Sequence, residues 1–123
     1  MSRYFFDSYP IIELIMGNKK FDRFRDVKIV TSVLNMMEVY YFLLREFNRE
    51  TAEYWMGALD VELVNVIRLD VAVEAVNFKF LYKKEKLSYV DCYGYVMAKK
   101  YRMKFLTGDE KFRGKENVEF VKM

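Results

Sequence analysis

A chain of 123 residues is long enough for one domain with one hydrophobic core, and its content of 53% hydrophobic and 18% aromatic residues excludes a disordered chain. The net charge of +3, from 21 basic and 18 acidic residues, permits RNA or another phosphate-bearing partner without requiring one. The absence of histidine excludes a serine-type catalytic triad and histidine-containing zinc sites.

Cys92 is the only cysteine, so an intramolecular disulfide is also excluded. We expect this thiol to be a small buried residue, because the chain has no histidine to activate it as a nucleophile. No apolar run approaches the roughly 20 residues that span a membrane. The charged, aromatic start MSRYFFD does not resemble a signal peptide, so we expect a cytoplasmic protein.

Predicted strands and helices alternate along the chain. Strands are predicted at residues 3–6, 27–30, 61–67, 103–106 and 118–121. Helices are predicted at residues 10–16, 19–25 and 49–59, and after the capping residues Ser32, Asp70 and Ser88 through about residues 47, 84 and 101. This alternation predicts one α/β domain over residues 1–123, with a mainly parallel sheet covered on both faces.

Four acidic residues stand at comparable places in this pattern. Asp7 and Asp109 follow predicted strands, whereas Glu38 and Asp91 lie early in predicted helices. Each has a purely structural explanation: Asp7 can cap the first helix together with Ser8, Asp91 is a first-turn acid favoured by the helix dipole, and Asp109 can form a turn after Gly108.

Glu38 is the hardest of the four to explain structurally. Among the twelve residues from Val33 to Leu44, only Asn35 and Glu38 are polar, which predicts a helix buried on most faces. A buried carboxylate needs a partner, and Asn35 lies on the same face. Arg45 returns to that face two turns later, but its Cα would lie about 10 Å away.

The carboxyl ends of parallel strands meet at one edge of a sheet, so the four acids should converge there. Clustered carboxylates repel, by about 4 kcal/mol per pair at 4 Å and an effective dielectric of 20. A hard divalent cation held by carboxylates is the usual compensation, and it can activate water against a phosphodiester.

The motifs around these acids also resemble those of a known family. A strand, an acid and a hydroxyl residue open the chain in YFFDSYPIIELI, a glutamate follows a Thr-Ser step in VTSVLNMMEVYY, a helix begins in LSYVDCYGYVMAKK, and Thr-x-Asp follows a strand in FLTGDEKF, with Phe112 as a packing residue. This ordered set is similar to the PIN-domain proteins, and it looks close to the VapC-type ribonuclease toxins. The likeness covers nearly the whole chain.

The resemblance implies a three-layer α/β/α fold and a ribonuclease that depends on Mg²⁺ or Mn²⁺. It implies that Asp7, Asp91 and Asp109 hold one or two ions, and that Glu38 is a further ligand or orients the attacking water. Products with a 5′-phosphate and a 3′-hydroxyl are implied as well. Ser8, Asn35 and Thr107 would support the ligands, although helix or turn capping explains Ser8 and Thr107 equally well.

Partners follow from the same resemblance, which implies an RNA substrate, a homodimer and a small antitoxin. RNA contacts are expected from Lys111, Arg113 and Lys115, or from Lys83, Lys84 and Lys86, although charge runs are usually solvated surface. The apolar run from Met36 to Leu44, with Tyr54, Trp55 and Met56, predicts a homodimer or antitoxin interface; a dense monomer core is the alternative.

Other functions remain open at this point. The chain resembles PIN nucleases of RNA processing and decay as well as the toxins, and a PIN fold can be kept for protein contacts without catalysis. A phosphoryl-accepting receiver domain and a DxD phosphatase also cluster acids in a doubly wound fold. Both want paired acids after the first strand, whereas Asp7 is followed by Ser8 and Tyr9.

Overall fold

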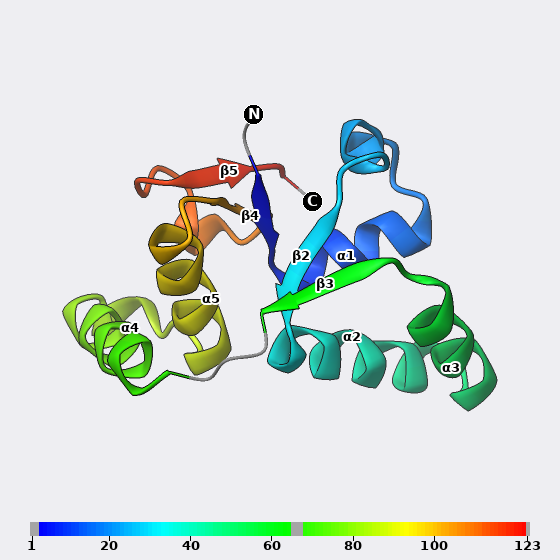
Figure 1. Ribbon diagram of the computed structural model, residues 1–123, viewed down its shortest axis with the longest axis horizontal. Coiled ribbons are helices and arrows are strands. Elements are labelled where there is room, and N and C mark those ends of the chain that lie inside the picture. Colours follow the sequence, from blue (N-terminus) through cyan, green and yellow to red (C-terminus); the bar gives the residue numbers. More distant parts are fainter. Residues whose placement is uncertain (1–2, 65–67, 123) are drawn as a thin grey trace.

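The computed structural model describes residues 3–64 and 68–122, and it contains a five-stranded sheet in which every pairing is parallel. The strand order is β3-β2-β1-β4-β5 (Figure 1). The strands are β1 (Tyr4–Phe6), β2 (Ile29–Ser32), β3 (Val61–Val64), β4 (Lys104–Thr107) and β5 (Val118–Phe120). The central position of β1 places the residue after it in the middle of the carboxyl edge.

Helices cover both faces of the sheet, which confirms the predicted three-layer α/β/α architecture (Figure 1). One layer contains α1 (Ser8–Met16), the 3₁₀ helix η1 (Lys19–Phe24), α2 (Val33–Glu46) and α3 (Arg49–Ala58). The other contains α4 (Leu69–Leu81), α5 (Tyr89–Lys100) and the 3₁₀ helices η2 (Lys83–Glu85) and η3 (Glu110–Phe112).

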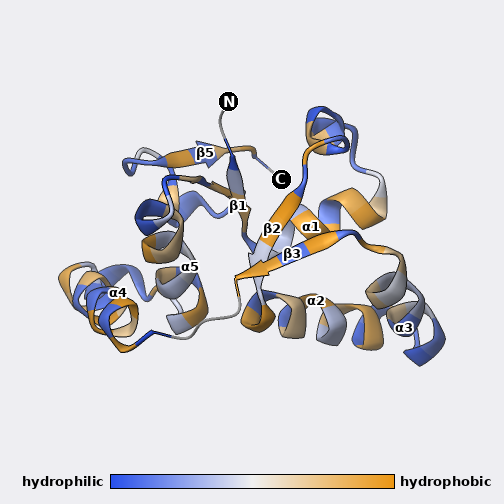
Figure 2. Ribbon diagram, in the orientation of Figure 1, coloured by the Kyte–Doolittle hydropathy of each residue, from blue (hydrophilic) through white to orange (hydrophobic). Residues whose placement is uncertain are grey.

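Successive side chains of the central strands point to opposite faces of the sheet, so a hydrophobic core forms on each face. Phe5 and Phe105 pack with α5, whereas Phe6 and Leu106 face the α1–α2 layer. Figure 2 shows the hydrophobic residues along β2, β3 and α1. Gly94 lets α5 approach the sheet closely, because a Cβ there would lie 2.9 Å from the ring of Phe5.

Most of the predicted helices and strands are present, and several residues that were expected to begin or end a helix do so. Gly17 ends α1 in the left-handed conformation, with φ of 78°. Ser32 Oγ accepts a hydrogen bond from Asn35 N at 3.1 Å, and Ser88 Oγ accepts one from Asp91 N at 3.0 Å. Cys92 is buried as predicted, and burial raises the pKa of its thiol to about 11.

Some boundaries were predicted wrongly. The second strand runs over residues 29–32 rather than 27–30, because Val27 N still bonds to Phe24 O in the preceding turn, while Thr31 and Ser32 pair with β3. The element at 19–25 is a 3₁₀ helix, and the helix predicted through residue 84 ends at Leu81. The last part of the strand predicted at 61–67 lies outside the described residues.

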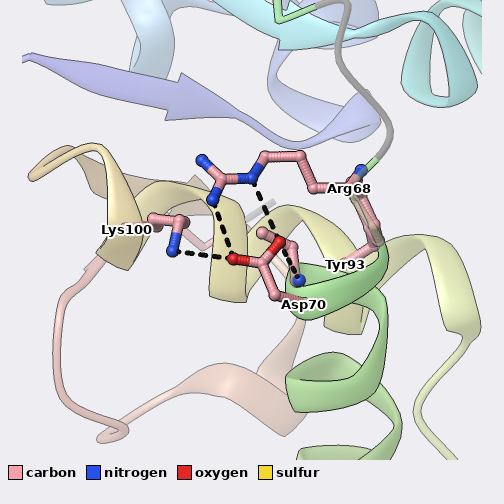
Figure 3. A network of polar contacts seen from close by, with 5 residues as sticks. Arg68, Asp70, Tyr93 and Lys100 are labelled. Carbon is pink, nitrogen blue, oxygen red and sulfur yellow. Dashed lines mark hydrogen bonds and ion pairs between the residues drawn. The ribbon is translucent and has the colours of Figure 1, made fainter.

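Asp70 does not cap α4, which corrects another expectation. The capping position is Arg68, which makes no side-chain capping bond, and Asp70 lies in the first turn. Its Oδ2 accepts from Arg68 Nη2 at 2.8 Å and from Lys100 Nζ at 3.2 Å (Figure 3). Asp70 therefore ties the start of α4 to the end of α5. In residues 3–64 and 68–122, no helix has both the length and the apolar character to cross a bilayer.

Candidate active site

Two of the four acids lie just after the carboxyl ends of neighbouring strands. Asp7 follows β1 directly, and Asp109 follows β4 after Gly108. Phe6 and Leu106 are register partners in the parallel β1–β4 pair, and Asp7 N donates to Leu106 O at 3.0 Å. Both carboxylates consequently lie at the same edge of the sheet.

Helices bring the other two acids to this edge. α2 begins at Val33, immediately after β2, and places Glu38 in its second turn. α5 begins at Tyr89, and Asp91 lies in its first turn after the Ser88 cap. The convergence predicted from the sequence is therefore present in the fold.

A single cleft of about 730 Å³ contains all four acids. One side of it is apolar, and Ser8, Ser88 and Arg45 contribute polar groups. The remaining residues that line it are Tyr9, Ile12, Leu34, Met37, Tyr41, Phe42 and Val90.

Asp7 is held by hydrogen bonds from three different elements. Thr107 Oγ1 donates to its Oδ2 at 2.8 Å, Ser8 N donates to its Oδ1 at 2.8 Å, and Asn35 Nδ2 lies 3.5 Å from Oδ1. Asp7 is also the N-cap of α1, so the capping explanation and the cleft position are both correct. These bonds fix the carboxylate of a residue whose surface is only 3% exposed.

Glu38 receives a hydrogen bond from Ser8, whose Oγ donates to Glu38 Oε1 at 2.5 Å. Asn35 Nδ2 donates to Ser8 Oγ at 3.0 Å, and Asn35 Oδ1 accepts from Ser32 Oγ at 2.6 Å. A continuous chain of polar groups thus runs from the end of β2 to Glu38. Ser8, Asn35 and Thr107 therefore all donate hydrogen bonds to acids of the cleft.

The expectation that Glu38 is buried was wrong, because α2 is not enclosed on most faces. Glu38 is exposed, and Met37 and Tyr41 beside it are each 62% exposed. Arg45 is not its partner either; Arg45 Nε pairs with Glu46 Oε2 at 3.0 Å. Apolar composition did not mean burial here, because α2 packs one side on the sheet and leaves the other open.

The electrostatics of the cleft are those of crowded carboxylates. Burial, followed by the charges of Asp91 and Glu38, raises the pKa of Asp7 to about 7, against the hydrogen bonds from Thr107 and Ser8. Burial, followed by the charges of Asp109 and Glu38, raises the pKa of Asp91 to about 6. The neighbouring acids thus make Asp7 and Asp91 harder to ionise, and a proton or a cation in the cleft relieves that repulsion.

The donor chemistry fits a hard divalent cation, since the cleft offers carboxylate oxygens and neither histidine nor thiolate. As positioned, no three acidic or cysteine side chains within residues 3–64 and 68–122 lie close enough together to enclose an ion. Such an ion would therefore be bound directly by one or two carboxylates, and water molecules would complete its coordination. This is the usual coordination of Mg²⁺ in proteins.

Asp109 has a structural role as well. Its Oδ1 accepts from Lys111 N at 3.0 Å at the start of η3, and its own N donates to Thr107 Oγ1 at 3.1 Å. The turn expected after Gly108 is therefore present, and it presents a half-buried Asp109 to the cleft.

The basic residues expected to contact RNA differ in their positions. Lys111 lies near the acids, since its charge lowers the pKa of Asp91 against the larger effect of burial. Arg113 pairs with Glu110 at 3.4 Å, and Lys115 pairs with Glu85 at 2.8 Å with its side chain only 13% exposed. Arg113 and Lys115 are thus engaged within the chain.

Sequence reasoning missed the aromatic side of the cleft. Tyr9 and Tyr41 line it and are 49% and 62% exposed. Tyr41 and Arg45 stand three and seven residues after Glu38, which is the spacing of one helix face. That spacing was the available signal for Tyr41.

The PIN domain family model matches residues 4–117. The chain belongs to the PIN-domain family. Nucleases with this domain generally depend on divalent metal ions. No curated protein sequence matches the chain.

Solved structures share this PIN fold at low sequence identity. A toxin–antitoxin complex from Klebsiella pneumoniae contains a chain that is 19% identical, with a TM-score of 0.74 over 99% of this chain and 100% of that one. The sarcin–ricin loop cleaving toxin VapC20 of Mycobacterium tuberculosis is 18% identical, with a TM-score of 0.78 over 96% and 98%. Rickettsia felis VapBC2, bound to a DNA fragment from its promoter, is 11% identical, with a TM-score of 0.72 over 97% of each chain.

Proposed function

We propose that this PIN domain is a divalent-metal-dependent endoribonuclease and the toxin of a type II toxin–antitoxin pair. One observation carries the catalytic part: four acids from four separate elements converge in one cleft, where burial and the charges of the neighbouring acids raise the pKa values of Asp7 and Asp91. Structural acids gain nothing from this crowding, whereas a metal-dependent phosphodiesterase uses it to hold its ion.

Asp7, Asp91 and Asp109 would hold Mg²⁺ or Mn²⁺, directly or through water, and Glu38 would hold it or orient the attacking water. The ion, when bound, supplies Lewis-acid polarisation of the phosphodiester and lowers the pKa of water. Thr107 and Ser8 keep Asp7 in one rotamer, and Ser8 also orients Glu38. Cleavage would leave a 5′-phosphate and a 3′-hydroxyl.

The toxin assignment is supported by the kind of protein in which this fold recurs. The Klebsiella chain belongs to a toxin–antitoxin complex, and the Mycobacterium protein is a toxin that cleaves the sarcin–ricin loop. We extend both descriptions to this chain, with a small antitoxin as partner and the cytoplasm as location. A processing or decay nuclease with the same chemistry is the alternative.

A homodimer is also part of the proposal. Val33, Met37 and Leu44 of α2 and Tyr54 of α3 are exposed, and a hollow of about 380 Å³ lies between α2 and Met56. An apolar surface of this kind favours association with a second copy or with the antitoxin.

The test is cleavage of single-stranded RNA by purified protein freed of any inhibitor. We expect cleavage with Mg²⁺ or Mn²⁺ and none with EDTA. Equal cleavage in EDTA, or none on several RNAs with any divalent ion, would contradict the proposal and favour a catalytically silent PIN module. An upstream reading frame for a small protein would separate the toxin from a processing nuclease.

A further inference from the structure

The cleft itself is acidic, so an RNA strand must be held by positive charge elsewhere. Eleven of the 21 basic residues form ion pairs with carboxylates of the described residues. Half of the ten that remain gather at one place, around the end of α4, η2 and η3. These residues are Lys79, Lys83, Lys84, Lys86 and Lys111.

Contacts tie this basic group together. Lys79 Nζ donates to Leu87 O, and Lys111 Nζ donates to Lys86 O at 3.4 Å. The single acid within residues 83–86, Glu85, is neutralised by Lys115. The net charge of this surface is therefore positive, directly beside the cluster of carboxylates.

Two exposed aromatic rings stand within the same group. Phe80 and Tyr89 are each 69% exposed, although large apolar rings are normally covered. Lys83 Nζ lies 4.7 Å from the ring centre of Phe80, and Lys79 Nζ lies 4.9 Å from that of Tyr89. With Val76, these four residues line a hollow of about 220 Å³.

This hollow adjoins the cleft along the chain. Ser88 and Val90 line the cleft, and Tyr89 between them lines the hollow. Asp91, one residue further, is one of the four acids. The hollow that holds Tyr89 and Phe80 is thus adjacent in the chain to the acidic cleft.

We propose that Phe80, Tyr89, Lys79 and Lys83 form a binding platform for the unpaired nucleotides that flank the scissile phosphate of single-stranded RNA. Open aromatic faces beside lysines are the combination that holds single strands, because bases stack on the rings while the cations meet the phosphates. The choice of substrate rests on the proposed nuclease function. The charge excess favours a polyanion over a second copy of this chain.

Binding is measured in EDTA, where no cleavage occurs, by fluorescence anisotropy of a labelled single-stranded RNA and of its duplex. We expect Phe80→Ala and Tyr89→Ala each to weaken single-strand binding by at least about fivefold, because stacking is lost. Lys83→Gln should lower the slope of log Kd against log salt by about 0.7. Two control variants should bind like wild type: Phe47→Ala, which changes another exposed aromatic residue, and Lys20→Gln, which changes a lysine of η1 that forms no ion pair with any described residue.

Unchanged single-strand affinity in both aromatic variants would overturn the platform. Equal losses of affinity in the two controls, or equally tight duplex binding that Phe80→Ala does not alter, would overturn it as well. If Phe80→Ala only reduces the mass in light scattering, the patch is an interface between copies, which overturns it too. If wild type cleaves RNA, and Phe80→Ala and Tyr89→Ala bind single-stranded RNA as tightly as wild type, the platform is contradicted and the proposed nuclease function is not. RNA binding through these residues without cleavage in Mg²⁺ or Mn²⁺ supports the platform and contradicts the proposed nuclease.

Discussion

Thr107 donates a hydrogen bond to Asp7 at 2.8 Å across 100 residues of sequence, from the end of β4 to the end of β1. Both residues are buried, and the bond fixes the carboxylate that is most enclosed in the cleft. Thr107→Val keeps the shape and removes the donor. We expect the free energy of unfolding to fall by about 1–2 kcal/mol and cleavage to slow by about 10- to 100-fold.

The matched control is Thr107→Ser, which retains the hydroxyl. It should recover most of the cleavage rate even if it loses some stability with the methyl group. If Thr107→Val and Thr107→Ser slow the reaction equally, Thr107 acts through packing, and its hydroxyl does not position Asp7.

Glu38 provides a separate test, because it is exposed and removing its charge should disturb the fold little. We expect Glu38→Gln to leave the free energy of unfolding within about 0.5 kcal/mol of wild type while cleavage falls sharply. Near-normal cleavage by a folded Glu38→Gln protein would remove Glu38 from the proposed catalytic set.

Carboxylate repulsion should appear in thermal melts without metal. Asp91→Asn removes one negative charge from the cluster of carboxylates. The free energy of unfolding in EDTA should therefore rise, by about 1–2 kcal/mol after solvent screening. Asp109→Asn should gain less, because Asp109 also caps η3. Wild type should gain about 2.7 kcal/mol from Mn²⁺ at a hundredfold excess over Kd, and both variants much less.

Asp60→Asn is the control for these melts, since Asp60 lies before β3 and its side chain is 89% exposed. It should respond to Mn²⁺ as wild type does. A lower melting temperature of Asp91→Asn in EDTA, together with an unchanged Mn²⁺ response, would mean that no repulsive cluster exists.

The same crowding predicts how stability depends on pH. The pKa of Asp7 is raised from 3.8 to about 7, and that of Asp91 from 3.8 to about 6. Because the folded protein holds these protons more tightly than the unfolded chain, their contribution to stability is complete below about pH 4 and is lost as pH rises through 6 and 7. Urea unfolding in EDTA should show falling stability from pH 5 to 8, with a shallower fall in Asp91→Asn.

A substitution on the outer side of α2 tests the proposed dimer. Leu44→Glu places a charge on the outer side of α2, away from the cleft, and should convert a dimer to a monomer in light scattering at micromolar concentration. Val73→Glu on α4, which is 53% exposed, should leave the mass unchanged. A monomeric wild type, or loss of the dimer only in Val73→Glu, would contradict this interface.

The sequence predicted the convergence of the acids well, because their positions depend on strand ends and helix starts. Alternating strands and helices imply a parallel sheet, and its carboxyl edge then collects Asp7 and Asp109 whatever the exact element boundaries are. Ser32 and Ser88 mark the helices that carry Glu38 and Asp91.

The exposure of each side chain was not predictable in the same way. The run from Val33 to Leu44 is apolar enough for a buried helix, yet which face meets the sheet depends on packing between distant segments. Asp70 likewise pairs with Lys100, 30 residues away, so no local capping signal could reveal its role. Apolar composition cannot distinguish a core from a surface intended for a partner.

The most direct test of the central claim is the rate of RNA cleavage in Mn²⁺ by wild type and by Asp7→Asn, Glu38→Gln, Asp91→Asn and Asp109→Asn, with Asp60→Asn as control. A contaminating ribonuclease would be indifferent to substitutions in this chain. We predict Mn²⁺-dependent cleavage by wild type and Asp60→Asn, and a loss of at least about 100-fold in each of the other four folded variants. Equal rates in all six proteins would contradict the assignment of the cleft as a metal-dependent ribonuclease site.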